Sequence, residues 1–182
     1  ESSMAEVKAA IQSEPWLAAH FDIGEKYISC DVARFGSDRT VIMYWEGLHI
    51  KKIRTMLKSA VNEVVDQIKI LQQQYAVRLT NIIVDEDGVG GGVVDYLKCR
   101  GFVNNSKPLK EKGKALNFAN LKSQCYYRLA EKINRNEIGV TCDEETERLL
   151  TEELEWVRLP KEIDTSKVSI ISKDKIKEQK GF

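Results

Sequence analysis

The sequence lacks several features that mark particular classes of protein. Its 182 residues include only two histidines and four cysteines, with no CxxC pair. Because the cysteines are widely scattered, neither a zinc site nor a disulfide framework is indicated. His20 and His49 also lack metal-ligand spacing. We expect reduced, mostly buried thiols in a cytosolic protein, at Cys30, Cys99, Cys125 and Cys142.

Long apolar runs, a signal peptide and a net charge are also missing. No run approaches the roughly 18 apolar residues that a membrane-spanning helix needs, so we expect a soluble protein with no membrane contact. The 28 basic and 28 acidic residues cancel, which argues against a domain that grips nucleic acid over its whole surface. No GxxxxGK[ST] phosphate loop is present.

The composition that remains, 42% hydrophobic and 31% charged, is that of an ordinary globular domain. A short helical pattern over 3–12 is ended by Pro15, so residues 1–25 are interpreted as a lead-in segment from a preceding domain. Residues 26–182 are predicted to form one domain. The chain begins without Met and ends in mid-pattern at Phe182, so we expect a fragment truncated at its C-terminus.

The order of predicted elements defines an α/β fold. Three β-branched and aromatic runs, over 27–33, 40–45 and 48–56, predict an antiparallel three-strand meander. Ser59 can cap a helix that runs to about Tyr75 with one apolar stripe. A buried strand over 79–84 and a helix over 93–100, closed by Gly101, follow.

The second half is predicted to be mainly helical. A short strand at 102–103 and a polar loop over 104–116 precede a helix over 117–134, whose apolar face carries Leu121, Cys125, Leu129 and Ile133. An acidic helix is expected over 144–156. Two strand candidates, 155–159 and 167–171, and the start of a helix at 173–179 complete the pattern.

Two acidic positions stand at the ends of predicted strands. Asp31 and Asp85 each follow a β-branched run and precede a glycine-containing loop. A strand that follows a meander through a helical crossover can lie parallel to the first strand. At the strand spacing of about 4.8 Å, two carboxylates on one face can share a cation such as Mg²⁺ or Mn²⁺, and two ions about 4 Å apart suit a nuclease.

This order resembles the ribonuclease H-like fold, a mixed sheet flanked by helices. Within that class, the segment 31–40, which reads DVARFGSDRT, is similar to the first motif of the nuclease domain of phage terminase large subunits. Four further stretches agree, and together the resemblance spans roughly 26–182: VDEDGVGGGVVDYL at 84–97, Asn120 with the helix after it, EELEW at 152–156, and ISKDKIKE at 171–178.

The resemblance implies a metal-dependent endonuclease that cuts concatemeric double-stranded DNA by two-metal hydrolysis in the host bacterial cytoplasm. It implies that Asp31 bridges the ions and Asp85 holds one of them. It also implies a terminase ATPase domain in the same parent chain, and a portal and a small terminase subunit as partners. The family places a third metal-binding aspartate just beyond a segment like 175–182, where this chain stops, so we expect the isolated fragment to be only weakly active.

Other residues have weaker assignments. Asp38 is a second candidate ligand, although an Asx turn or an ion pair with Arg39 explains it equally well. Asp87 competes with Asp85 if the strand extends two residues further. Gly88, Gly90, Gly91 and Gly92 supply either positive φ at a tight turn or a close approach to phosphate. Six lysines are candidate DNA contacts, with a solvated surface as the alternative: Lys107, Lys110, Lys112, Lys114, Lys173 and Lys175.

Alternative functions remain open at this point. Another ribonuclease H-like nuclease, such as a Holliday-junction resolvase, has the same elements. An actin- or sugar-kinase-type ATPase also carries an acid and a glycine turn on its first strand. A dinucleotide-binding turn is disfavoured, because the spacing is GVGGG rather than GxGxxG.

Overall fold

The computed structural model describes residues 24–33, 39–110, 112–114, 116–155, 157 and 167–170. The chain divides into two compact units. One comprises the described residues of 24–103 and 137–142, and holds the sheet. The other comprises the described residues of 104–136 and those from 143 onward. The predicted lead-in segment lies almost entirely outside the described residues.

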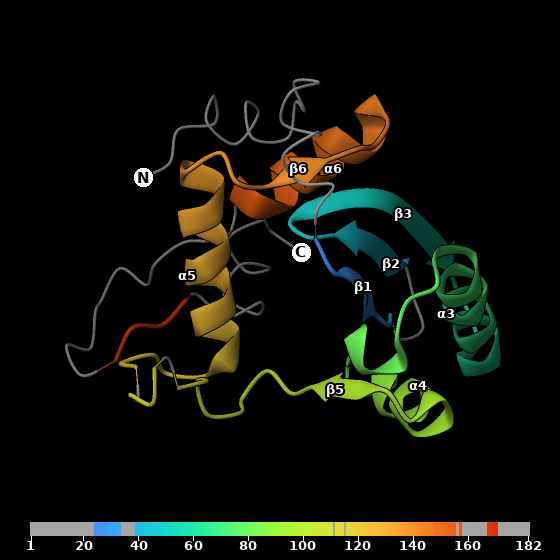
Figure 1. Ribbon diagram of the computed structural model, residues 1–182, viewed down its shortest axis with the longest axis horizontal. Helices are drawn as coiled ribbons and strands as arrows, with labels where there is room; N and C mark the ends of the chain where they lie inside the picture. Colours follow the sequence, from blue (N-terminus) through green and yellow to red (C-terminus); the bar gives the residue numbers. More distant parts are fainter. Residues whose placement is uncertain are drawn as a thin grey trace. The chain divides into compact units, whose positions relative to one another are not determined.

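The sheet confirms the predicted meander. Strands β1 (Lys26–Asp31), β2 (Arg39–Glu46) and β3 (His49–Leu57) pair antiparallel, and the turn between β2 and β3 places Gly47 at a positive φ of 56°. β4 (Ile82–Asp85) and β5 (Arg100–Phe102) are parallel to β1 on one side, and β6 (Gly139–Val140) is parallel to β3 on the other. The six strands lie in the order β5-β4-β1-β2-β3-β6, and Figure 1 shows the meander of β1, β2 and β3 within this sheet.

Two helices cover one face of this sheet (Figure 1). Helix α3 (Val61–Tyr75) and helix α4 (Gly90–Leu97) contribute buried side chains to the same core as the strands. In β1, Ile28 and Cys30 point into this core, and their β4 counterparts Ile82 and Val84 do the same. Because side chains alternate along a strand, the residues between them lie on the opposite face.

The start of α3 differs from the prediction. The helix begins after Ala60, whose N–H donates to Glu63 Oε2 at 2.8 Å. Ser59 does not cap the helix, because its hydroxyl donates to Thr40 Oγ1 at 3.0 Å. The capping residue is therefore one position later than expected.

The strand predicted over 79–84 is shorter than expected. Leu79–Asn81 form a 3-10 turn, and β4 begins only at Ile82. The Asn81 N–H donates to the Arg78 carbonyl at 2.9 Å, and its amide group donates to the Lys26 carbonyl at 3.0 Å. Asn81 therefore closes a turn rather than extending the ladder.

The helix predicted over 93–100 was misplaced. α4 begins at Gly90 and ends at Leu97, and its C-cap Lys98 adopts a left-handed φ of 56°. Gly101 does not close the helix and instead lies within β5. A Cβ at Gly101 would lie 1.8 Å from Glu86 Oε2, so the glycine makes room for that side chain.

The second unit contains the two predicted helices. α5 (Leu121–Asn134) begins at an Asn120 cap, whose side chain accepts a bond from the Ser123 N–H at 2.9 Å. The predicted start at 117 was too early. The expected apolar face is only partly correct, because Ile133 is buried but Cys125 is exposed. The loop before α5 is held by the buried Gln124, which bonds the backbone of Leu109.

The acidic helix α6 (Glu144–Glu155) confirms its prediction. Of the two strand candidates in the tail, 155–159 is largely outside the described residues, and its first residue belongs to α6. Around 167–171 the described part makes a single bridge, between Val168 and Phe118. No helix among the described residues has the length and apolarity to cross a membrane.

Candidate active site

The pairing of β1 with β4 brings the two candidate acids together. The register aligns Ser29 with Ile83 and Cys30 with Val84. Asp31 and Asp85 are the next residue on each strand, and each is the last residue of its strand. Two adjacent parallel strands therefore end in a carboxylate at the same edge of the sheet, with no strand between them.

Both carboxylates lie on the face of the sheet opposite α3 and α4. Asp31 follows the buried Cys30 and is exposed, and Asp85 follows the buried Val84 and is half-buried. On the same face, the Trp45 indole N–H donates to the Ser29 hydroxyl at 2.9 Å. The acids thus occupy an accessible edge backed by the hydrophobic core.

The pKa of the Cys30 thiol is affected by both acids. Burial raises its pKa to about 12, and the negative charges of Asp31 and Asp85 add to that increase. Asp31 and Asp85 are therefore both within electrostatic range of one buried sulfur atom. The expectation of mostly buried cysteines was wrong in part, because only Cys30 is buried, Cys99 and Cys142 are half-buried and Cys125 is exposed.

The backbone that follows Asp31 is held in place by a hydrogen bond to Thr40. This threonine on β2 is fully buried, and its Oγ1 accepts bonds from the Ala33 N–H at 3.1 Å and from the Ser59 hydroxyl at 3.0 Å. The backbone that leaves β1 is thereby tied to β2 and to the start of α3. Thr40 ends the sequence motif over 31–40, but the motif gave no role for this residue.

The carboxylate of Asp85 holds the loop that follows this residue. Asp85 Oδ1 accepts a bond from the Asp87 N–H at 3.1 Å, and the Glu86 N–H donates to the Phe102 carbonyl at 2.9 Å. Asp87 itself is exposed in the turn. Because β4 ends at Asp85, the two-residue extension that would bring Asp87 to the same side does not occur.

The glycine run divides between two structural roles. Gly88 has a positive φ of 80° and forms the turn. Gly90 begins α4, and a Cβ there would lie 1.7 Å from the Asp85 carbonyl oxygen. This glycine therefore allows the helix to approach the backbone of a candidate metal ligand.

The remaining candidate residues are not brought to this edge by any described contact. Asp38, Lys173 and Lys175 lie outside the described residues. The other four lysines are exposed and belong to the unit that contains α5 and α6: Lys107, Lys110, Lys112 and Lys114. Within the part of the chain that the structure describes, no group of three or more His, Cys, Asp or Glu side chains gathers as a metal site.

Solved structures resemble this chain in fold, although its sequence matches no family model or curated protein. The predicted fold class, a mixed sheet flanked by helices, is confirmed by solved structures that match in fold. Among solved structures, the nuclease domain of the large terminase subunit gp2 of bacterial virus Sf6 matches with a TM-score of 0.80 and 17% identity, over 99% of this chain and 91% of that one.

Two metal-containing structures also match. A mutant of the same Sf6 domain with manganese gives a TM-score of 0.82 at 17% identity, with the same coverage. The large terminase nuclease of thermophilic phage G20c with bound magnesium gives 0.52 at 18% identity, over 81% of this chain and 71% of that one. The resemblance seen in the sequence motifs is confirmed at the level of the fold.

The environment of Cys30 yields a testable prediction. A rise of its pKa from 9.0 to about 12 lowers the thiolate fraction at pH 8 by about 10³-fold. We therefore expect iodoacetamide to label the exposed Cys125 first and Cys30 last, with rates followed by mass spectrometry of the native protein. Unfolding in urea should make the rates similar, whereas rapid labelling of Cys30 in the folded state would contradict the buried position.

Proposed function

We propose that this chain is the metal-dependent endonuclease domain of a phage DNA-packaging terminase large subunit, and that it cuts concatemeric double-stranded DNA. The observation that carries the proposal is the termination of two adjacent parallel strands in Asp31 and Asp85 on one accessible face. The likeness in fold to terminase nuclease domains supports it. The domain is proposed to comprise residues 26–182.

The donor set suits Mg²⁺ or Mn²⁺. Hard divalent ions prefer carboxylate oxygens and water, and Asp31 and Asp85 supply carboxylate oxygens at the ends of adjacent strands. We assign Asp31 as the bridging ligand of a two-ion site and Asp85 as a ligand of one ion, with Asp38 and Asp87 as second-tier candidates. Bound there, the ions would supply a water of lowered pKa and stabilise charge on the leaving oxygen.

The protein itself holds the carboxylates of Asp31 and Asp85 in position at an accessible edge of the sheet. Thr40 ties down the backbone after β1, and the Asp87 N–H orients one oxygen of Asp85. Ligands held on strand ends keep their positions more accurately than ligands on loops. Asp31 is exposed and Asp85 is half-buried, and the scissile phosphate of the duplex is proposed to lie over these two acids.

The wider context follows from the same proposal. The parent chain would carry the packaging ATPase as a further domain and would work with a portal and a small terminase subunit in the host cytoplasm. The six candidate lysines would contact backbone phosphates: Lys107, Lys110, Lys112, Lys114, Lys173 and Lys175.

Cleavage of supercoiled plasmid DNA tests the proposal. The protein is incubated with Mn²⁺, Mg²⁺, Ca²⁺ or EDTA, and the products are separated on agarose gels. Nicked and linear DNA should form with Mn²⁺ or Mg²⁺ and not with EDTA. Equal cleavage in EDTA, or none with either ion, would contradict the proposal, and a strong preference for four-way junctions over linear duplex would favour a resolvase.

A further inference from the structure

A groove with basic residues lies at the N-terminal ends of β4 and β5, whereas Asp85 lies at the C-terminal end of β4. A shallow groove of ≈ 260 Å³ is lined by Leu79, Thr80, Lys98, Cys99 and Arg100. Its walls are the 3-10 turn before β4 and the connection from α4 to β5. All of these residues belong to the unit that holds the sheet.

The charged groups of the groove are available to a ligand. Lys98 and Arg100 are exposed, as is Thr80. Among the described residues, neither the Lys98 ammonium nor the Arg100 guanidinium forms a hydrogen bond or an ion pair with another side chain. Two cations and a hydroxyl therefore stand around a groove whose own lining is mostly apolar.

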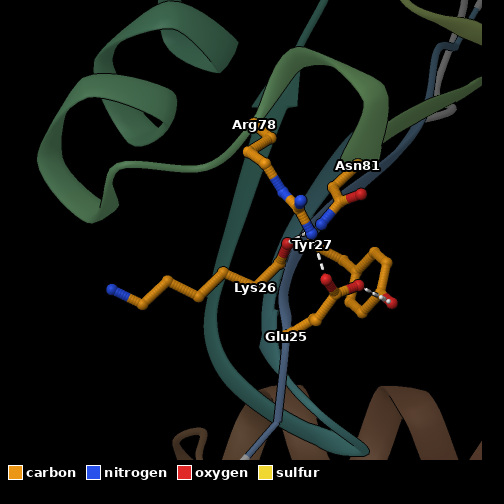
Figure 2. Close-up of polar contacts among 5 residues, drawn as sticks. All are labelled: Glu25, Lys26, Tyr27, Arg78 and Asn81. Carbon is orange, nitrogen blue, oxygen red and sulfur yellow. Dashed lines mark hydrogen bonds and ion pairs between the residues drawn. The ribbon is translucent and has the colours of Figure 1, made fainter.

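Two acids lie near the groove: Glu86, whose charge acts on the groove residue Cys99, and Glu25, which is already occupied. Glu25 bonds the Tyr27 hydroxyl at 2.8 Å and pairs with Arg78, and Figure 2 shows both contacts converging on its carboxylate. The bond from Tyr27 and the charge of Arg78 lower the pKa of Glu25. Glu25 thus stays ionised, and its partners are Tyr27 and Arg78 rather than the groove cations.

Arg100 lies on the same face of the sheet as the two acids. It is paired with Ile83, and Phe102, two residues later, is paired with Asp85. Its charge also acts on the hydroxyl of Tyr27, which alternates onto that face of β1. Arg100 therefore stands two residues behind the acidic edge, roughly 7 Å along the strand direction.

We propose that this groove binds a backbone phosphate of the same duplex that is cut at Asp31 and Asp85. The inference rests on the proposed function and adds a positioning site to it. Arg100 offers a planar fork of donors, Lys98 a mobile point charge and Thr80 a hydroxyl, which together suit a phosphodiester oxygen. Contacts of this kind fix the register of the duplex without reading its sequence.

Binding of a short fluorescein-labelled duplex in Ca²⁺ buffer tests the groove separately from cleavage. Lys98→Gly and Arg100→Gln should each weaken binding about five- to tenfold near 0.1 M salt, and each should reduce the slope of log Kd against log salt concentration by about 0.9. Lys52→Gln is the matched control, because it removes an exposed charge from β3 of the same unit. It should leave affinity and slope unchanged.

The Lys98 variant separates binding from folding. Lys98 has a φ of 56°, a conformation that glycine adopts more easily than lysine. The Tm of Lys98→Gly should therefore not fall, so lost affinity reports a lost contact. The Arg100→Gln variant supplies a second measurement at a position with ordinary strand geometry.

The outcomes distinguish the two proposals. If the unchanged protein binds and cuts DNA but both groove variants bind with the same affinity and salt slope, the groove proposal is wrong and the nuclease proposal stands. If the unchanged protein neither binds nor cuts duplex DNA, the proposed function itself fails. An equal loss in Lys52→Gln would show a general charge effect and would overturn the groove.

Discussion

Replacing Asp31 with asparagine should abolish metal-dependent DNA cleavage while leaving the fold intact. Loss of a residue that only orients a metal ligand costs about 10- to 100-fold, so loss of a bridging ligand should cost at least about 10². The substitution keeps the shape of the side chain and removes its charge. Initial rates of plasmid nicking in Mn²⁺, for the variant and the unchanged protein, measure the effect.

Thermal unfolding gives this prediction a second readout. Asp31→Asn keeps the size of the side chain at an exposed strand end, so the metal-free Tm should change little. Mn²⁺ should raise the Tm of the unchanged protein, because a ligand that binds only the folded state stabilises it, and this rise should be lost in Asp31→Asn. A lower metal-free Tm would indicate a structural role for Asp31.

One matched control and one test of a second-tier ligand accompany this prediction. Asp66→Asn removes an exposed carboxylate from α3, on the other face of the sheet, and should change neither cleavage nor the Mn²⁺-induced rise in Tm. Asp87→Asn removes a carboxylate in the turn after β4, and its backbone N–H bond to Asp85 remains possible. If Asp87→Asn matched Asp31→Asn and Asp85→Asn retained activity, the assignment of Asp85 would be wrong.

The arrangement of strands was predictable from the sequence because its signals are local and strong. Apolar alternation located β1, β2 and β3, and the single helical stripe of α3 implied the crossover that makes β4 parallel to β1. β6 was not predicted, because two residues carry no period and pairing with β3 alone defines that strand. The misplaced boundaries had tertiary causes: Asn81 bonds Lys26 across the sheet, and Glu86 occupies the space above Gly101.

The candidate site was predictable to a lesser extent. Asp31 and Asp85 were visible as acids at strand ends, and the parallel register then made them neighbours. Thr40 and the groove beside Arg100 were not, because their roles depend on contacts between segments that are distant in sequence. The glycine run was recognisable as a turn, but the sequence could not show which glycine was required for close packing.

Replacing Gly90 or Gly92 of that run with alanine should change the free energy of unfolding in opposite directions. In Gly90→Ala the new Cβ would lie 1.7 Å from the Asp85 carbonyl oxygen, a backbone atom that cannot move aside independently. We expect the free energy of unfolding to fall by about 3 kcal/mol, as in severe overpacking. Cleavage should fall by about 10²-fold, because the shift displaces the strand end that carries Asp85. Urea unfolding and plasmid nicking measure the two effects.

Gly92→Ala is the matched control for Gly90→Ala, two residues further along α4. Its Cβ would meet the Val61 methyl groups at 3.6 Å, which is ordinary van der Waals contact. Because alanine favours the helix over glycine, the free energy of unfolding should rise by about 0.5 kcal/mol, with cleavage retained. Equal destabilisation by the two substitutions would mean that the whole run needs glycine. Destabilisation at Gly90 alone would locate the requirement at the contact between α4 and the Asp85 backbone.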